Sequence, residues 1–127
     1  MYEVVITQPF VAAHRLTLYD GSLEPLHGHN WKVEVRLEGK DLDQIEVLID
    51  FLEVKKEVQT LLKEIDYTFL NENERFAGRN PSAEVVAHWI FQKLKSAIRH
   101  PVAKIRKVTV WETEDCAATY SESPPPL

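Results

Sequence analysis

The chain has 127 residues, of which 44% are hydrophobic and 28% charged, and it carries a formal net charge of −5. This length and composition predict one globular domain, and the negative charge argues against a broad nucleic-acid-binding surface. The only cysteine, Cys116, excludes an intrachain disulfide. No stretch is long and apolar enough to span a membrane, and the start of the sequence shows no signal-peptide pattern. We therefore expect a cytoplasmic protein with neither a membrane nor a nucleic acid as partner.

Two strands, a helix and two loops are predicted for residues 2–80. Residues 2–14 are rich in Val, Ile, Tyr and Phe, which favours a strand. Residues 15–28 contain turn-forming residues and predict a loop, and residues 30–39 alternate apolar and charged side chains as a half-buried strand does. From residue 50 to 65, apolar side chains recur every three or four positions and predict a helix. Residues 66–80 are polar and predict another loop.

The last third of the chain predicts a second helix and two closing strands. Asn80 is a candidate helix cap, with Pro81 at the first helical position. The apolar stripe that follows runs to about Arg99. Residues 105–110 and 117–120 are short, apolar or alternating, and they predict the closing strands.

The predicted order is strand, strand, helix, helix, strand, strand, which favours an α+β fold. We expect a four-stranded antiparallel sheet with both helices on one face. Residues 1–120 would form the single domain, and residues 121–127, which include three prolines, would form a flexible C-terminal tail. An open sheet has two edges, and edges are commonly protected by pairing with other chains, so we also expect assembly.

The pattern His27-Gly28-His29, together with His14, is the strongest candidate for a site. Residues two apart in an extended segment project to the same side, so His27 and His29 can offer two imidazoles to one metal ion. A neighbouring strand could supply His14 as the third ligand. Three histidines would leave a coordination position open, as a catalytic zinc requires. The alternative interpretation is two surface histidines around a turn glycine.

Four other side chains are candidates for chemistry. Glu24 precedes His27 by three residues, so it could be a fourth ligand, a partner of the ligands or a general base. Asp66 could orient a neighbour, and Tyr67 could donate a proton. Glu112 ends an apolar strand and could accept two hydrogen bonds from an amino-heterocycle. Each also has an ordinary interpretation, as a solvated loop charge, a polar helix end, a partly buried aromatic or a strand-end charge.

The sequence resembles the 6-pyruvoyltetrahydropterin synthase / 6-carboxytetrahydropterin synthase family. Motifs in family order cover nearly the whole chain up to residue 120. They are Phe10-Val11-Ala12-Ala13-His14-Arg15-Leu16, Leu26-His27-Gly28-His29-Asn30-Trp31, Leu48-Ile49-Asp50-Phe51, Asp66 to Asn71, Asn80-Pro81-Ser82-Ala83-Glu84 and Trp111-Glu112-Thr113.

The resemblance implies the family's tunnelling fold, a homohexamer of two stacked trimers with active sites between subunits, and a lyase activity on a reduced pterin triphosphate. It implies that His14, His27 and His29 bind Zn²⁺ and that Glu112 anchors the pterin ring through its 2-amino group and ring N–H. The substrate would be 7,8-dihydroneopterin triphosphate or a close relative.

Two departures from the family pattern affect the expected reaction. The synthases usually carry a catalytic cysteine a few residues before the His-Gly-His motif, where this chain has Leu23 and no cysteine nearby. They also usually have a histidine after the aspartate of the middle motif, where this chain has Tyr67. The Glu-x-x-His-Gly-His pattern formed by Glu24 resembles instead the type III branch, which cleaves the substrate side chain to give 6-hydroxymethyl-7,8-dihydropterin, a folate precursor. The alternatives are 6-pyruvoyl- or 6-carboxytetrahydropterin synthase activity and a non-catalytic zinc- and pterin-binding module.

Overall fold

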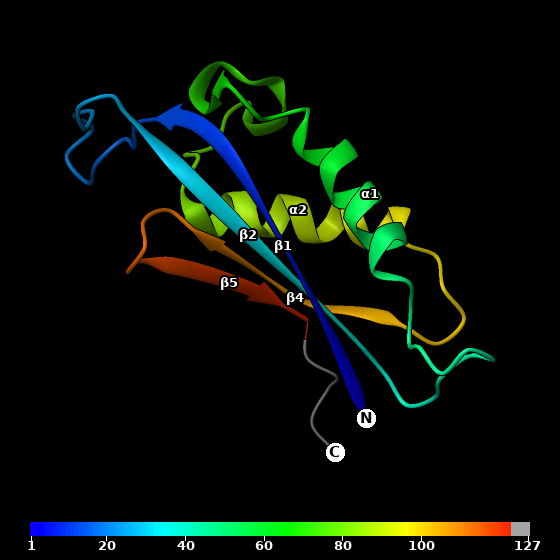
Figure 1. The fold of residues 1–127 in the computed structure, drawn as a ribbon. Helices are drawn as coiled ribbons and strands as arrows, with labels where there is room; N and C mark the ends of the chain where they lie inside the picture. Colours follow the sequence, from blue (N-terminus) through cyan, green and yellow to red (C-terminus); the bar gives the residue numbers. More distant parts are fainter. Residues whose placement is uncertain (123–127) are drawn as a thin grey trace.

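The computed structural model describes residues 1–122 and forms one twisted sheet covered by helices (Figure 1). The sheet has five strands in the order β3-β1-β2-β4-β5. Their bounds are β1 Tyr2–His14, β2 His27–Gly39, β3 Thr68–Phe69, β4 Lys104–Trp111 and β5 Ala117–Ser121. The prediction of four antiparallel strands is therefore wrong in two respects: there is a fifth strand, and β3 pairs parallel to β1.

The additional strand lies within the segment that was predicted to be a polar loop. It pairs Thr68 with Ala12 and Phe69 with Ala13. Two 3₁₀ turns, Leu70–Glu72 and Glu74–Phe76, follow it. A strand of two residues is too short to show a period of two in the sequence, so hydrophobic patterning could not reveal it.

The long hairpin of β1 and β2 is the centre of the sheet, and its strand predictions are confirmed. The two strands pair along their whole length, from Tyr2 opposite Gly39 to His14 opposite His27. In β1 the even-numbered residues from Val4 to His14 face the core. β2 begins at His27, earlier than the predicted residue 30, because its first residues pair with the end of β1.

Both helices cover the same face of the sheet, as predicted, with α1 (Phe51–Leu62) over β1 and α2 (Ala83–Ala97) over β4 and β5 (Figure 1). The Asp50 carboxylate caps α1 by accepting a hydrogen bond of 2.9 Å from the backbone N–H of Leu52.

The predicted start of α2 is wrong. Ser82, not Asn80, is the N-cap, and its hydroxyl accepts a hydrogen bond of 3.2 Å from the N–H of Val85. Asn80 instead contacts Thr17 in the loop after β1, and Pro81 contacts His14, the last residue of β1. The helix ends at Ala97, two residues before the predicted Arg99.

The C-terminal segment is ordered slightly further than expected. Ser121 is the last residue of β5, and Glu122 accepts hydrogen bonds from Lys95 and Tyr120. The rest of the predicted tail, residues 123–127, lies outside the described residues. Within residues 1–122, no helix is long and apolar enough to cross a membrane.

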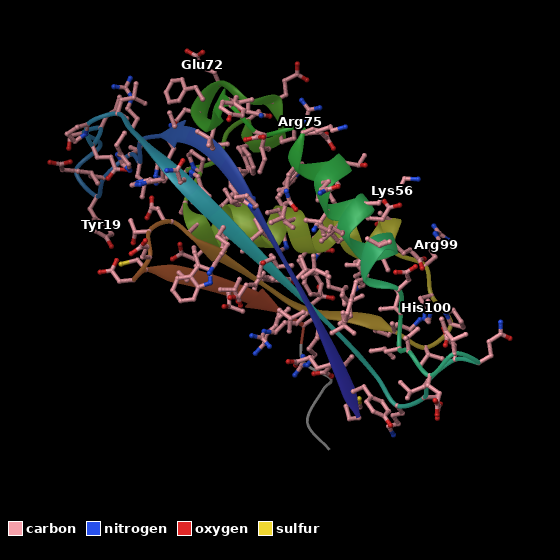
Figure 2. All side chains as sticks on the ribbon, viewed as in Figure 1. Tyr19, Lys56, Glu72, Arg75, Arg99 and His100 are labelled. Carbon is pink, nitrogen blue, oxygen red and sulfur yellow. The ribbon has the colours of Figure 1, made fainter. Side chains whose placement is uncertain are left out.

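The core lies between the sheet and the two helices, and charged side chains lie outside it. Lys56, Arg75 and Arg99 extend away from the body of the protein (Figure 2). At the end of the sheet where β1 finishes, the buried Trp31 stacks on Phe10 with ring centroids 5.5 Å apart. This aromatic pair ends the apolar core, and polar side chains follow it along β1 and β2.

Candidate metal and substrate site

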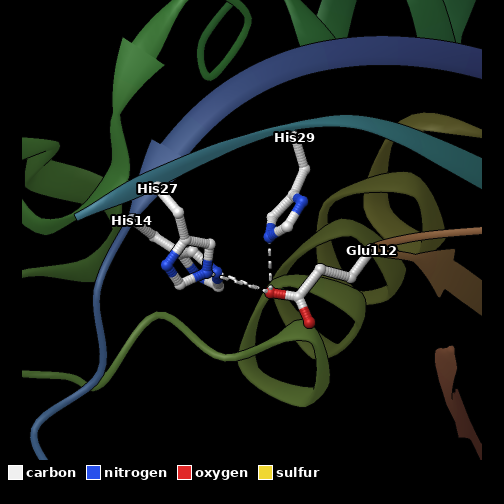
Figure 3. Close-up of side chains that lie close together, drawn as sticks. All are labelled: His14, His27, His29 and Glu112. Carbon is white, nitrogen blue, oxygen red and sulfur yellow. Dashed lines mark ion pairs between the residues drawn. The ribbon is translucent and has the colours of Figure 1, made fainter. Parts of the chain in front are cut away.

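Three strand ends converge beyond the aromatic pair and carry four side chains toward one point (Figure 3). His14 is the last residue of β1, and His27 and His29 open β2. Glu112 directly follows β4. The pairing of β1 with β2 places His14 opposite His27, so the predicted meeting of these histidines on neighbouring strands is confirmed.

The alternation of the strands directs these side chains to the helix-covered face. His14 continues the buried row of β1, and His27 and His29 continue the row of β2 that includes Trp31. The indole of Trp31 lies edge-on to His14, with ring centroids 4.9 Å apart, and its Nε1 donates to the carbonyl of Ala12 at 3.1 Å. The Trp31 indole is therefore held by a hydrogen bond and forms the apolar surface against which the imidazoles of His14 and His29 pack.

Backbone carbonyls fix the orientation of two of the imidazoles. Nδ1 of His14 donates to the carbonyl of Pro81 at 2.8 Å, and Nδ1 of His27 donates to that of Pro25 at 2.9 Å. A carbonyl can only accept, so in the neutral imidazole the proton is on Nδ1 and Nε2 has a lone pair. Such carbonyl contacts commonly orient metal-binding histidines. Burial lowers the pKa of His29, which favours its neutral form as well.

The three Nε2 atoms surround one oxygen of Glu112. Its Oε1 lies 2.6 Å from Nε2 of His14, 3.5 Å from that of His29 and 3.8 Å from that of His27. Nε2 of His14 is buried and lacks a hydrogen-bonding partner. The ligand atoms of all four residues lie within 4.8 Å of one another. Three imidazole nitrogens and a carboxylate are a donor set that suits Zn²⁺, so the residues present fit the metal that the sequence implied.

Glu24 lies beside this cluster on the loop between β1 and β2. Its Oε1 accepts a hydrogen bond of 2.9 Å from the N–H of Leu16 and lies 3.8 Å from Nε2 of His27. The loop folds back on itself through a bridge between Thr17 and Leu23. A backbone hydrogen bond from Glu24 to the carbonyl of Leu16 closes it at 3.0 Å. The carboxylate is thus held at the rim of the cluster formed by His14, His27, His29 and Glu112.

Two asparagines, whose role at this loop the sequence did not reveal, hold its first residues. Asn71 both accepts from the N–H of Arg15 and donates to its carbonyl, at 3.0 and 2.7 Å. Asn80 contacts Thr17 in the same way, at 2.8 and 3.0 Å. The spacing of Asn80 before a helix was interpreted as a cap, and an amide that binds a distant backbone leaves no local sequence signal.

Asp66 and Tyr67 are not part of the cluster formed within this chain. The Asp66 carboxylate accepts a hydrogen bond of 2.8 Å from the N–H of Val11 on the edge of β1. Tyr67 is 82% exposed and has a φ of 57°, in the left-handed region. Its N–H donates to the carbonyl of Val11 at 2.6 Å, so both residues attach β3 to β1.

Comparison with known proteins gives consistent matches over almost the whole chain. Residues 3–123 match the family model described as 6-pyruvoyl tetrahydropterin synthase. A dihydroneopterin monophosphate aldolase from Pyrococcus furiosus is 31% identical over 110 residues, covering 87% of this chain and 89% of that protein. A 6-carboxy-5,6,7,8-tetrahydropterin synthase from Synechocystis is 32% identical over 116 residues, covering 87% and 86%.

Solved structures show the same fold. The 6-pyruvoyl tetrahydropterin synthase of Caenorhabditis elegans superposes with a TM-score of 0.82 at 30% identity, covering 96% of each chain. A Plasmodium vivax 6-pyruvoyltetrahydropterin synthase, described as a catalytic-residue mutant in which a glutamate is replaced by alanine, gives a TM-score of 0.79 at 22% identity, covering 97% and 98%.

Proposed function

Because the chain belongs to the 6-pyruvoyl tetrahydropterin synthase family, we propose that it is a zinc-dependent lyase that cleaves the side chain of 7,8-dihydroneopterin triphosphate. The products would be 6-hydroxymethyl-7,8-dihydropterin and a phosphorylated glycolaldehyde. The observation that carries this proposal is Glu24, a carboxylate 3.8 Å from Nε2 of His27 in a loop that contains no cysteine. The base nearest the metal-binding cluster is therefore a carboxylate and not a thiolate.

The substrate would be held at two places, the edge of its pterin ring and the hydroxyls of its side chain. Glu112 would accept hydrogen bonds from the 2-amino group and ring N–H of the pterin, which present two donors side by side to a carboxylate. His14, His27 and His29 would hold Zn²⁺. A bound zinc would act as a Lewis acid on the hydroxyl oxygens of the substrate side chain and lower their pKa.

Glu24 would be the general base of a retro-aldol cleavage. It would accept the proton of the hydroxyl on the second side-chain carbon, which becomes an aldehyde as the bond to the first carbon breaks. The electron pair of that bond would pass into the C=N bond of the ring next to the first carbon. Protonation of the first carbon would then give the hydroxymethyl group. We assign this protonation to Tyr67 or Asp66, and the exposure of Tyr67 favours delivery from a neighbouring subunit.

Two relatives support a role of this kind for a carboxylate. The P. furiosus relative is named an aldolase, which is the reaction type proposed for Glu24, although its name specifies a monophosphate. The P. vivax structure is described as lacking a catalytic glutamate, so a catalytic carboxylate occurs in a protein of this fold.

A second candidate function is the synthesis of 6-carboxy- or 6-pyruvoyltetrahydropterin, with Glu24 replacing the missing cysteine. It is favoured by the Synechocystis relative, whose identity of 32% is as high as that of the aldolase. The third candidate is a zinc- and pterin-binding module without turnover. The proposal also includes a homohexamer of stacked trimers and a cytoplasmic location.

Product identification separates these candidates. Purified, zinc-loaded protein would be incubated with 7,8-dihydroneopterin triphosphate, and in parallel with the monophosphate, and the pterin product identified by mass spectrometry. We expect 6-hydroxymethyl-7,8-dihydropterin. A 6-pyruvoyl or 6-carboxy product would refute the cleavage reaction, and a tightly retained, unchanged pterin would support the binding module.

Two variants test the assigned residues. Glu24→Gln should lower turnover by about 10²-fold or more, in the range that general bases contribute, while zinc content stays unchanged. The exposed Glu72→Gln is the matched control and should leave turnover unchanged (Figure 2). His14→Ala should lose zinc, and full zinc occupancy in that variant would refute the ligand assignment.

A further inference from the structure

Glu112 and His14 bring two lone-pair atoms, Oε1 and Nε2, into close contact. Nδ1 of His14 is occupied by the carbonyl of Pro81, so Nε2 of the neutral ring presents a lone pair. The atom nearest to it is Oε1 of Glu112, a second lone-pair donor, at 2.6 Å. Nε2 of His14 is buried and makes no hydrogen bond to any of the described residues. Two lone pairs at this distance repel each other, and a cation bound by both atoms would remove that repulsion.

The same oxygen faces the other two histidines. Oε1 lies 3.5 Å from Nε2 of His29 and 3.8 Å from Nε2 of His27. Neighbouring ligands of a tetrahedral zinc with bonds of roughly 2.0 Å are separated by about 3.3 Å. The three contacts of Oε1 straddle that value, so this oxygen lies where a fourth ligand would lie. A proton on His14 would satisfy one of these contacts, whereas a metal ion satisfies all of them.

We infer that Glu112 is a fourth metal ligand in the substrate-free protein and that it leaves the metal when a pterin binds. The second half of this inference rests on the proposed function, because the incoming ligand is taken to be a reduced pterin. In the resting state the metal would be closed by four protein ligands, as in a structural zinc site. Substrate binding would draw the carboxylate to the ring N–H groups and open one coordination position.

The local structure allows this exchange without backbone movement. The backbone N–H of Glu112 donates to the carbonyl of Cys116 at 3.0 Å, which fixes the start of the turn between β4 and β5. The side chain of Glu112 is 29% exposed, so rotation about its own bonds can carry the carboxylate away from the buried His14. The contacts with all three histidines are made by Oε1, so one rotation would release them together.

The first test measures metal affinity without any substrate. Zn²⁺ would be titrated against a chromophoric chelator in competition with the wild-type protein, Glu112→Ala and Glu112→Gln. Loss of a directly bound ligand should weaken zinc binding at least about tenfold, the lower end of the effect seen even for residues that only support ligands. Glu24→Gln removes the other carboxylate at the cluster and should leave the affinity unchanged. Equal affinities of the wild type and both Glu112 variants would overturn the inference.

The second test reads the coordination directly. Co²⁺ would replace Zn²⁺, and the visible absorption bands would be recorded before and after addition of 6-hydroxymethyl-7,8-dihydropterin. The bands of Glu112→Gln should differ from those of the wild type without pterin, and pterin should shift the wild-type bands. Bands that are identical in the two proteins would overturn the resting ligand, and wild-type bands that ignore bound pterin would overturn the exchange.

The outcomes of these two tests do not depend on whether the protein catalyses the proposed reaction. Neither measurement uses turnover, and zinc affinity is measured without a pterin. A protein that cleaves no substrate but loses zinc affinity in Glu112→Ala would keep the resting ligand and refute the proposed function. A protein that cleaves substrate while all Glu112 variants bind zinc equally would do the opposite. Circular dichroism of each variant confirms that it is folded before its metal affinity is compared.

Discussion

At the scale of single residues, the site depends on side chains whose orientation is fixed by neighbours distant in the sequence. His14 and Pro81 are 67 positions apart, yet their hydrogen bond sets which nitrogen of the imidazole faces His27, His29 and Glu112. The identities and spacing of the histidines were visible in the sequence because the period of a strand is short and regular. The carbonyl that orients His14 was not, because every residue has a carbonyl and only the fold selects one.

Tyr67 is held in a backbone conformation that disfavours its own side chain. Its φ of 57° lies in the left-handed region, which is unfavourable for a residue with a Cβ by roughly 1–2 kcal/mol. The side chain is 82% exposed, so burial does not offset that strain. We predict that Tyr67→Gly changes the free energy of unfolding by no more than about 1 kcal/mol, because relief of strain offsets the greater entropy of the unfolded glycine.

Variants of Tyr67 also distinguish its effect on stability from its proposed role in the reaction. If Tyr67 returns a proton to the substrate, turnover should fall in Tyr67→Gly and equally in Tyr67→Phe, which keeps the ring and lacks the hydroxyl. Urea denaturation gives the stability and product formation gives the turnover. Full activity of Tyr67→Phe would remove this residue from the reaction.

At the scale of elements, the loop that carries Glu24 is attached to the rest of the fold by side-chain amides. Asn71 and Asn80 each make two hydrogen bonds to the backbone of one loop residue, Arg15 and Thr17 respectively. Each amide thereby supplies the backbone hydrogen bonds that a neighbouring strand would otherwise make. This attachment fixes Glu24 beside the cluster, although the loop itself was predicted only as a connection.

Loss of one attachment should loosen the loop without removing the metal. Asn80→Ala deletes both contacts with Thr17 but keeps the carbonyl of Pro81 that orients His14. We expect faster amide hydrogen exchange in residues 17–23, lower kcat and unchanged zinc content. Asn30→Ala removes an exposed asparagine from β2 and serves as the control. Unchanged exchange in Asn80→Ala would show that the loop is held by other contacts.

A polar network joins the end of β5 to α2. Glu122 accepts hydrogen bonds from Lys95, Tyr120 and Gln92, and these bonds lower its pKa from 4.5 to about 2. A carboxyl whose pKa is lower in the folded state stabilises the fold above its unfolded pKa, and this stabilisation is lost as the pH falls.

The stability difference between the wild type and Glu122→Gln should therefore depend on pH in one direction. It should be constant above pH 4.5 and should shrink as the pH falls toward about 2. The network is exposed, so the difference should be small and should decrease with salt. Thermal denaturation of both proteins between pH 7 and pH 3 measures it. A difference that grows as the pH falls would contradict the cause assigned to the pKa.

At the scale of the whole molecule, the sequence was most informative where patterns are long. The paired strands of 13 residues and both helices were predicted because each shows several repeats of its period. β3 has two residues and was missed. The start of α2 was misplaced because Asn80 and Ser82 are both acceptable caps, and the tertiary contact with Thr17 decides between them. In both cases, the pairing of β3 with β1 and the N-cap of α2, contacts between distant parts of the chain decided the structure, and local sequence preference did not.

The surface also shows a region suited to assembly. The start of β1, residues 42–50 and Phe51, the first residue of α1, surround a hollow of about 440 Å³. Ile45, which lines the hollow, is 74% exposed, and Leu52, which follows Phe51 in α1, is 72% exposed. Exposed apolar side chains that gather in one place commonly mark an interface.

We predict that Leu52→Glu lowers the molar mass of the proposed homohexamer measured by light scattering, because a buried unpaired charge is unfavourable in an interface. Leu18→Glu, on the exposed loop between β1 and β2, is the control and should leave the mass unchanged. An unchanged mass in Leu52→Glu would place the interface elsewhere, with the sheet edges at β3 and β5 as the next surfaces to test.

The direct pairing of His14 with His27 has a consequence for how the chain folds. Side chains alternate between the faces of a sheet, so a slip of one residue between β1 and β2 would turn His14 to the opposite face from its partners. Only the correct alignment brings three imidazoles to one ion, and an ion that binds that alignment alone stabilises it by mass action. A bound metal ion would then favour the correct register of the β1–β2 hairpin over shifted registers, before any substrate is present.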